Sequence, residues 1–143
     1  LRIGSYFFVG FGGSNITPFN TVLEFSEDYI YEALAPLMNE VNEYTRICRR
    51  QFRSKLMENK CVLVTHCPGR DTLDFMAEKG NLGSEAIAKI VEEYKPVLHI
   101  SAHIHEARGV VQNGSTLCVN PGAASKGHAA LVEIDDTVNA ELI

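Results

Sequence analysis

A short apolar run ends in a histidine and a proline in the segment Cys61-Val62-Leu63-Val64-Thr65-His66-Cys67-Pro68. A run of this length, rich in apolar and β-branched residues, is typical of a buried strand. Pro68 ends the run because its ring fixes the backbone and offers no amide donor to a sheet. The segment therefore predicts a strand over 61–65, with His66 just beyond its carboxyl end.

A second run of this kind, at 97–101, is followed by two further histidines in Ala102-His103-Ile104-His105-Glu106. If the two strands are parallel neighbours, their carboxyl ends bring His66, His103 and His105 to one crevice. Alternate residues of an extended chain lie on one side, about 6.6–6.8 Å apart, so we expect His103 and His105 to face one metal or two adjacent metals. Ile104 would then enter the core. Taken alone, a H-x-H pair is a weak motif, since such pairs also occur on exposed strands.

The remaining pattern alternates helices and strands. Ser26 is a candidate cap for a helix with apolar residues at three- and four-residue spacing as far as residue 52, in which Pro36 should cause a kink or a break. Ser84 begins a second helix that stops before Pro96. Asn113-Gly114 predicts a hairpin. Strands are predicted over 2–9, 61–65, 97–101, 109–112, 115–119, 129–134 and the last run to 143. Together these elements predict a mixed α/β sandwich-like domain.

The composition is that of one globular domain. The 143 residues are 45% hydrophobic and 22% charged, which favours a folded core over intrinsic disorder. The apolar runs are far shorter than the roughly 18 residues of a membrane span, so no membrane partner is expected. A net charge of −5 offers no broad basic surface, and nucleic acid is not an expected partner.

Cysteines and the first residue bear on cellular context. The four cysteines are Cys48, Cys61, Cys67 and Cys118, with no C-x-x-C spacing. This pattern favours free thiols and a cytoplasmic location. The chain begins at Leu1 and runs directly into a strand-like segment, so we expect that upstream sequence is missing.

Two histidines are expected to be structural or peripheral. His99 lies between Leu98 and Ile100, which predicts a buried, hydrogen-bonded side chain. His128, beside Gly127, is expected in a solvent-exposed loop.

Three motifs together resemble the closing motifs of the calcineurin-like metallophosphoesterases. They occur in the family's order as Thr65-His66-Cys67-Pro68, Ala102-His103-Ile104-His105-Glu106 and Asn120-Pro121-Gly122. The loop Gly12-Gly13-Ser14-Asn15, followed by Thr17-Pro18-Phe19, further resembles a prokaryotic, chiefly archaeal branch. The resemblance implies a four-layer α/β/β/α sandwich with a two-metal site.

The resemblance also implies roles for individual residues. His66 and His103 would bind one metal, and His105 the other. Asn15, Glu106 and Asn120 would lie around the ligands or in a substrate loop. Ala102 replaces the family's usual glycine, which raises the question of whether the backbone there needs a positive φ.

The family's earlier motifs do not occur between residues 1 and 143. These are Asp-x-His, a Gly-Asp motif with a bridging aspartate, and a Gly-Asn-His motif with the general-acid histidine. The resemblance therefore implies that residues 1–143 are the C-terminal portion of a single calcineurin-like phosphoesterase domain, a sandwich incomplete at its N-terminus. The bridging aspartate and the general acid would lie outside this chain.

The expected function of the complete protein is metal-dependent hydrolysis of a phosphomonoester or phosphodiester. Two divalent ions (Mn, Fe, Zn or Ni) would activate a water, and the partner would be a small phosphoester substrate. A homo-oligomer is left open. One alternative is a non-catalytic scaffold or remnant of the same fold that binds proteins. Another makes Cys67 a nucleophile activated by a nearby histidine.

Overall fold

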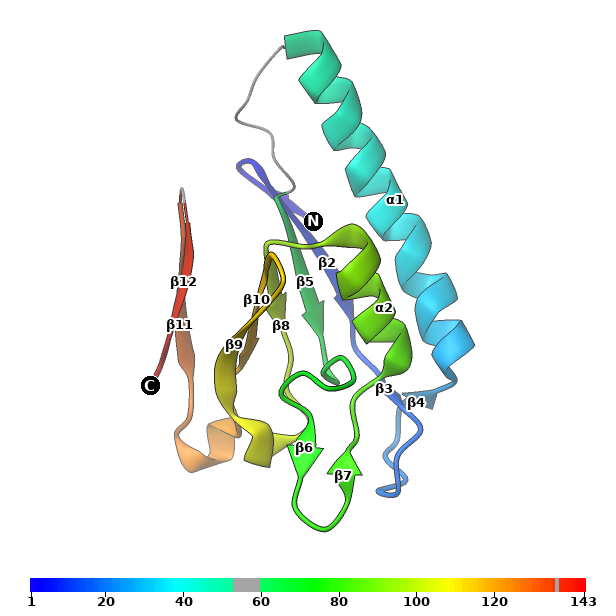
Figure 1. Ribbon diagram of the computed structural model, residues 1–143, viewed down its shortest axis with the longest axis vertical. Coiled ribbons are helices and arrows are strands. Elements are labelled where there is room, and N and C mark those ends of the chain that lie inside the picture. Colours follow the sequence, from blue (N-terminus) through cyan, green and yellow to red (C-terminus); the bar gives the residue numbers. More distant parts are fainter. Residues whose placement is uncertain (53–59, 136) are drawn as a thin grey trace.

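The computed structural model describes residues 1–52, 60–135 and 137–143. At its centre is a six-stranded sheet with the strand order β1-β2-β5-β8-β10-β9 (Figure 1). These strands are β1 Arg2–Ile3, β2 Tyr6–Phe11, β5 Cys61–Thr65, β8 Leu98–Ile100, β10 Thr116–Asn120 and β9 Gly109–Asn113. The four inner strands run parallel, and the two outer strands run antiparallel to their neighbours. Strands 61–65 and 97–101 are therefore parallel neighbours.

Three smaller sheets and four helices complete the described chain. The sheets pair β3 Ser14–Asn15 with β4 Glu24–Phe25, β6 Phe75–Met76 with β7 Gly80–Asn81, and β11 Ala130–Ile134 with β12 Val138–Leu142. The helices are α1 Glu27–Phe52, α2 Glu85–Tyr94 and two short 3-10 turns, η1 His105–Ala107 and η2 Ala124–Lys126.

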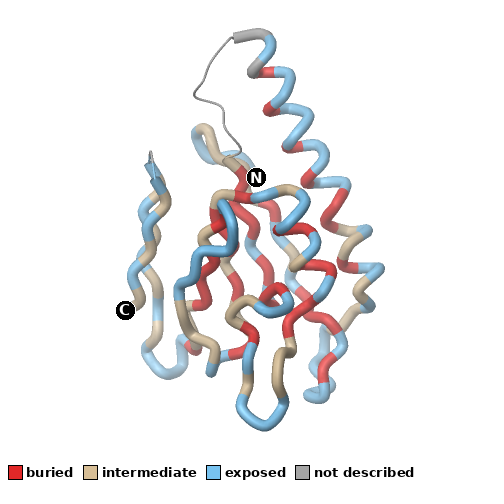
Figure 2. Tube along the Cα trace, in the orientation of Figure 1, coloured by how far each residue is buried: buried red, intermediate tan, exposed pale blue. Residues whose placement is uncertain are grey.

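The layers follow from which side chains each face of the central sheet buries. Both long helices pack on one face, and the β11–β12 hairpin packs on the other (Figure 1). The predicted mixed α/β sandwich-like fold is thus confirmed, and the described residues form three layers in the order α/β/β. Figure 2 shows the buried residues concentrated on the inner strands and on the helix faces turned toward them.

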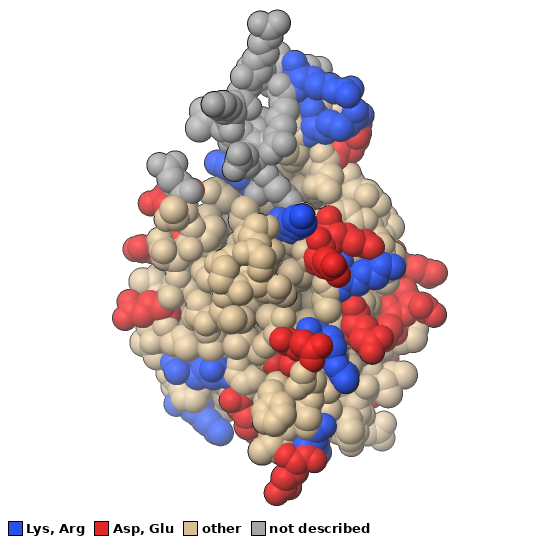
Figure 3. All heavy atoms as spheres, in the orientation of Figure 1, with Lys and Arg blue, Asp and Glu red and all other residues tan. Residues whose placement is uncertain are grey.

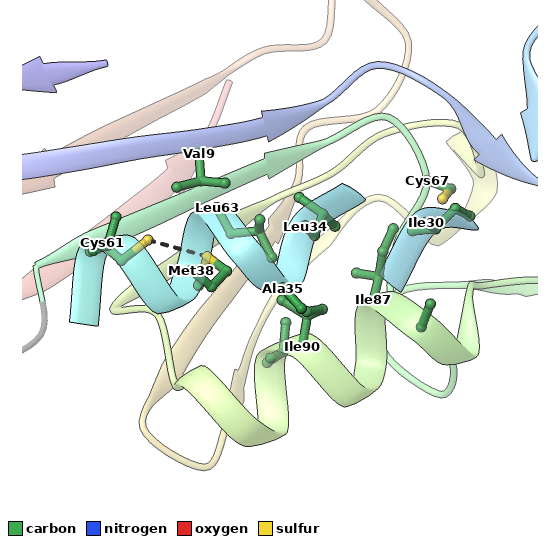
Figure 4. Close-up of a cluster of buried hydrophobic side chains, with 13 residues drawn as sticks. Val9, Ile30, Leu34, Ala35, Met38, Cys61, Leu63, Cys67, Ile87 and Ile90 are labelled. Atoms are coloured by element: carbon green, nitrogen blue, oxygen red, sulfur yellow. Dashed lines mark hydrogen bonds between the residues drawn. The ribbon is translucent and has the colours of Figure 1, made fainter. Parts of the chain in front are cut away.

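The larger core lies between the helices and the sheet. Its centre is apolar and includes Ile30, Leu34, Met38, Leu63, Ile87 and Ile90, each at most 1% exposed (Figure 4). The smaller core, on the opposite face, is centred on Val62, Leu98 and Val119. Since Val62 and Leu63 face opposite layers, β5 is apolar on both sides, as the uninterrupted run in the sequence indicates.

The first predicted strand is wrong in one respect, because residues 2–9 do not form a single strand. Gly4 takes a φ of +57°, and the chain turns back there so that β1 pairs antiparallel with β2. A glycine adopts this backbone conformation without steric cost. The turn makes β2, and not β1, the partner of β5.

Helix α1 begins as predicted but is not split by its proline. The Ser26 side chain accepts a hydrogen bond from Tyr29 N at 3.2 Å, which caps the first turn. Pro36 is exposed and lies inside one continuous helix. Because Pro36 lies on the solvent side, water can satisfy the carbonyl group that loses its helical donor.

Helix α2 is capped at both ends, and a contact with α1 strengthens its start. Ser84 accepts a hydrogen bond from Ile87 N at 3.1 Å, and Lys95 ends the helix in a left-handed conformation, one residue before Pro96. The Glu27 carboxylate, in the first turn of α1, accepts hydrogen bonds from Ser84 Oγ at 2.6 Å and Ala86 N at 2.8 Å. The two helices are thus joined at their N-termini by a charge-assisted contact.

The predicted hairpin is confirmed, with Asn113 pairing Thr116 across a turn in which Gly114 has a φ of +57°. All four cysteines are buried, and none of them forms a disulfide within the described residues. In the described parts of the chain, no helix combines the length and the apolar character needed to span a bilayer. On the face seen in Figure 3, acidic and basic side chains are intermixed.

Leu34→Ala should lower the free energy of unfolding by about 2–5 kcal/mol, because Leu34 is fully buried between α1 and the sheet and its loss leaves a cavity. Leu37, on the same helix, is 45% exposed, and Leu37→Ala should cost less than about 1 kcal/mol. Urea denaturation followed by circular dichroism measures both. Equal losses would contradict the assigned inner face of α1.

Candidate functional site

The candidate site lies at the edge of the sheet where the parallel strands end. β2, β5, β8 and β10 all point toward the lower edge of the molecule in Figure 1. The loops that follow them carry the sequence-predicted residues. His66 follows β5 directly, and His103 comes three residues after β8.

Backbone hydrogen bonds fix His66 between its two neighbouring strands. His66 N donates to Phe11 O at 3.0 Å, and His66 O accepts from Ala102 N at 2.9 Å. The sheet pairing therefore continues one residue past the end of β5. Since the backbone of His66 is held from both sides, the position of its imidazole is determined by the sheet.

The structure brings His66 and His103 into direct contact. His66 Nε2 and His103 Nδ1 lie 3.0 Å apart, and the two rings meet edge to face with their centroids 4.8 Å apart. One of these nitrogens must carry the proton and the other the lone pair, because two neutral acceptors would repel. The other ring nitrogen of His103, Nε2, is buried and has no hydrogen-bond partner among the described residues.

The backbone at His103 differs from the expected extended chain. His103 has a φ of +62°, and Ile104 N donates to Ala102 O at 2.7 Å, which closes a γ-turn around His103. Few residues with a side chain adopt a positive φ, and they keep it only where the surrounding contacts hold the backbone. Strand alternation fails here because β8 ends at Ile100, before the motif begins.

Two neighbours of His103 show how the turn fits the fold. Ile104 is fully buried, as expected. Ala102, which occupies the family's glycine position, is not among the described residues with positive φ, so its methyl group is accommodated. The unusual backbone angle falls on His103 instead.

His105 does not join the other two histidines. It begins the 3-10 turn η1 and is exposed. Within residues 1–52, 60–135 and 137–143, no three His, Cys, Asp or Glu side chains are grouped so as to hold a metal ion. Of the three predicted ligands, the structure therefore assembles two.

Burial and neighbouring charges determine the protonation of His103. Partial burial lowers the pKa of His103 below its ordinary value, and His66 and His105 lower it further. Glu24 acts in the opposite direction through its negative charge. His103 is thus favoured in its neutral form, which is the form that can donate a lone pair to a metal.

A buried series of hydrogen bonds from β8 supports the turn at His66. The Thr65 hydroxyl donates to Cys67 O at 2.6 Å and lies 2.8 Å from His99 Nε2. Because the single proton of the hydroxyl goes to Cys67 O, His99 Nε2 must carry a proton and donate to Thr65. Burial lowers the pKa of His99 to about 4, which keeps it neutral. His99 is therefore buried and hydrogen-bonded, as its sequence context indicates.

Asn120 supports the second histidine turn. It is fully buried at the end of β10, and its Nδ2 donates to Ile104 O at 2.8 Å. Its Oδ1 accepts from Gly122 N at 3.0 Å. One side chain thus joins the Asn-Pro-Gly turn to the turn that carries His103.

The other predicted residues lie around this centre. Asn15 is buried, and its Nδ2 donates to Leu82 O at 3.1 Å while its Oδ1 has no partner in the described chain. Glu106 is exposed on η1. His128 is half-buried against Gly122, which corrects the expected exposed loop position. Gly122 has a φ of +86°, and a Cβ there would lie 2.9 Å from His128 Nδ1.

Sequence reasoning missed the side chains that wall the site. Phe19, in the loop between β3 and β4, meets His103 with ring centroids 6.3 Å apart. Lys79, at the tip of the β6–β7 hairpin, places its ammonium 4.0 Å from the centre of the Phe19 ring. The motif Thr17-Pro18-Phe19 marked the first loop, but no local pattern singles out Lys79, because its contact joins segments 60 residues apart in the chain.

Glu24 shapes the loop that carries Phe19. Its Oε1 accepts hydrogen bonds from Thr17 Oγ1 at 2.8 Å and from the backbone and side chain of Thr21, both at 3.0 Å. The Thr21 amide is the largest cause that holds the pKa of Glu24 below its ordinary value. A carboxylate anchored in this way orders an otherwise irregular loop.

Cys67 does not fit the role of a nucleophile. Its side chain is fully buried, and burial raises the pKa of its thiol to about 11. A reactive cysteine needs an accessible thiolate. The geometry therefore argues against the nucleophile interpretation.

The two joined histidines fit part of a metal site. Imidazole nitrogens suit divalent transition metals, and a buried ring nitrogen without a partner is unusual unless a ligand satisfies it. His103 Nε2 is such a nitrogen, and the other nitrogen of the same ring lies 3.0 Å from His66 Nε2. A complete site would need ligands beyond these two side chains.

Comparison with known sequences supports one family. Residues 2–141 match the family described as metallophosphoesterase, calcineurin superfamily. The chain is 34% identical over 129 residues to an uncharacterized protein of Methanocaldococcus jannaschii, an alignment that covers 87% of this chain and 51% of the relative. It is also 37% identical over 67 residues to a UPF0046 protein of Caenorhabditis elegans, covering 47% of this chain and 23% of that protein. The chain spans about half the length of the first of these relatives.

Solved structures share the fold. One crystal structure aligns with a TM-score of 0.65 at 23% identity and covers 94% of this chain and 48% of the other. The crystal structure of a Thermus thermophilus protein, TT1561, aligns with a TM-score of 0.50 at 16% identity, covering 95% of this chain and 52% of that chain. At these identities the likeness concerns the fold alone.

His99 should make stability depend on pH between about 4 and 6.5. Its pKa is about 4 in the folded chain and near 6.5 when unfolded, so between these values the unfolded chain binds a proton that the folded chain does not. The free energy of unfolding should therefore fall as the pH is lowered through this range, by up to about 3 kcal/mol. Denaturation of the wild type and His99→Asn at several pH values measures the contribution. The same pH dependence in both proteins would contradict it.

Asn120→Ala should lower the free energy of unfolding by about 2–4 kcal/mol, because Ile104 O and Gly122 N would lose a buried partner. Asn139→Ala is the matched control, since Asn139 is exposed on β12 and its loss should change stability by less than about 0.5 kcal/mol. Chemical denaturation compares the two variants. A loss at Asn120 no larger than at Asn139 would refute the anchoring role.

Proposed function

The chain belongs to the calcineurin superfamily of metallophosphoesterases, and we propose that it carries part of the metal site of a phosphoester hydrolase. The observation that supports this most directly is the contact of His66 with His103 where parallel strands end, beside a buried ring nitrogen without a partner. The expected substrate is a small phosphomonoester or phosphodiester.

In this proposal, His66 and His103 hold one divalent ion and His105 contributes to a second. Manganese, iron, zinc and nickel all accept imidazole ligands together with carboxylates, so the histidines do not choose among them. When bound, such ions lower the pKa of a water molecule and polarise the phosphoryl oxygen.

The chain's own residues prepare these ligands. Burial and the adjacent His66 favour neutral His103, so little deprotonation is needed before it binds a cation. His99 Nε2 donates to the Thr65 hydroxyl and fixes its position. The Thr65 hydroxyl in turn donates to the backbone carbonyl of Cys67, the residue after His66. Asn120 holds the turn around His103. Ligands fixed by buried neighbours lose little conformational freedom on binding.

We further propose that residues 1–143 form the C-terminal portion of one domain, and a homo-oligomer is compatible with this proposal. The buried cysteines, none in a disulfide within the described residues, favour a cytoplasmic location. The non-catalytic scaffold is the competing proposal, and the observation in its favour is that the described chain groups only two of the three expected histidines.

His103→Ala in the complete protein should abolish metal retention and lower turnover of 4-nitrophenyl phosphate or its methyl diester by about 100-fold or more, because it removes the ring that meets His66. Metal content by mass spectrometry and release of nitrophenolate measure the two effects. Glu133→Ala, at an exposed position of β11, is the control and should change neither.

Unchanged turnover in His103→Ala would refute the hydrolase assignment. A wild-type protein that folds, binds no divalent metal and turns over neither ester would support the scaffold instead.

A further inference from the structure

Lys79 is linked to the histidine pair through Phe19, although it is distant from both in sequence. Its ammonium sits 4.0 Å from the centre of the Phe19 ring, within the range of a cation–π contact. Phe19 in turn meets His103 at 6.3 Å between ring centroids, with the planes at 77°. One aromatic ring thus joins the β6–β7 hairpin to the candidate metal site.

The backbone of the loop that carries Phe19 is held in place. Phe19 N donates to Thr17 Oγ1 at 3.3 Å, and Thr17 Oγ1 donates to the anchored carboxylate of Glu24 at 2.8 Å. On the other loop, Lys79 N donates to Met76 O at 3.2 Å and closes the tip of the hairpin. These hydrogen bonds order the backbone at Phe19 and at Lys79, and the ammonium itself contacts the Phe19 ring.

The charge of Lys79 is not neutralised within the described chain. The ion pairs found in the described chain join Arg46 to Glu43 and Lys89 to Glu93. In the same described residues, the Lys79 ammonium has no hydrogen bond, and its contact is with the Phe19 ring. Lys60 likewise lies over an aromatic ring, that of Tyr6, but Lys79 differs because its ring partner, Phe19, also meets His103. The three N–H donors of Lys79 remain available for an anion.

Arg108, which follows the histidine motif in the sequence, is less suited than Lys79 to bind an anion. Arg108 follows η1, and its guanidinium donates to Pro121 O at 3.1 Å and Ile143 O at 2.9 Å. These two contacts tie it to the Asn-Pro-Gly turn and to the last residue. Lys79, in contrast, has only the aromatic face as its recorded partner.

We propose that Lys79, held by Phe19, binds the phosphoryl group of the substrate and favours phosphomonoester dianions over phosphodiester monoanions. The inference rests on the proposed phosphoesterase function. At neutral pH a phosphomonoester carries nearly two negative charges and a diester carries one. Because the attraction of a fixed cation grows with the ligand's charge, Lys79 stabilises the bound monoester more than the bound diester.

The test compares two esters with the same leaving group, 4-nitrophenyl phosphate and methyl 4-nitrophenyl phosphate, in the complete metal-loaded protein. Lys79→Met should lower kcat/KM about tenfold or more for the monoester and about threefold for the diester, so that the ratio falls at least threefold. Lys79→Arg should restore most of the ratio. Phe19→Leu should lower it partly, since it keeps an apolar contact but loses the aromatic face.

Lys89→Met is the matched control. Lys89 also lies over an aromatic ring, 4.1 Å from the centre of Tyr31, but it is on α2 and pairs with Glu93. Its loss should leave the ratio unchanged. The wild-type preference should also weaken as ionic strength rises, more than in Lys79→Met, because salt screens an exposed charge.

Two outcomes separate this inference from the proposed function. Turnover of both esters by the wild type, with an unchanged ratio in folded Lys79→Met, overturns the role of Lys79 and leaves the hydrolase intact. If the wild type turns over neither ester, the hydrolase proposal fails, and calorimetry of inorganic phosphate binding then decides on Lys79. In that case, equal phosphate affinity in the wild type and Lys79→Met overturns the inference, and a loss of about fivefold or more in the variant upholds Lys79 as an anion-binding residue.

Discussion

The parallel pairing of β5 with β8 is the constraint on which the candidate site depends. The register joins Leu63 to His99 and Val64 to Ile100, so the two strands end at nearly the same height. Beyond that point the pairing continues only through Ala102 N and His66 O. The two chains then separate into turns, and the imidazoles of His66 and His103 meet across them. A sheet of this kind places side chains more precisely than a free loop could, because its backbone is hydrogen-bonded on both sides.

Buried polar side chains of the sheet form hydrogen bonds that fix the turns on which the histidines lie. His99 lies within β8 and reaches Thr65, while Asn120 ends β10 and reaches Ile104 O. Both are almost fully buried, where an unmatched polar group would be costly. Their hydrogen bonds therefore favour one arrangement of each turn. The positive φ of His103 is maintained in this setting, since the turn is anchored from two directions.

Motifs in the sequence predicted much of the fold and part of the site. The apolar runs at 61–65 and 97–101, the serine caps and the Asn-Gly turn each depend on local chemistry, and the structure has strands, helices and a hairpin at these places. Local rules failed where two tendencies compete. Pro36 should interrupt a helix, but packing of the inner face of α1 keeps the helix continuous. A single strand over 2–9 was expected, but Gly4 permits a turn that the apolar pattern does not reveal.

The sequence by itself determined where most strand-forming runs, helix caps and the hairpin turn lie, and which family the chain resembles, because these signals are encoded over a few residues. Only the tertiary structure decided that His66 and His103 meet in direct contact, whereas His105, exposed at the start of η1, does not group with them as a third ligand in the described chain. It also decided that Phe19 meets His103 and that Lys79 lies over the Phe19 ring. Contacts between distant segments follow from the packing of whole elements, and no short stretch of sequence records them.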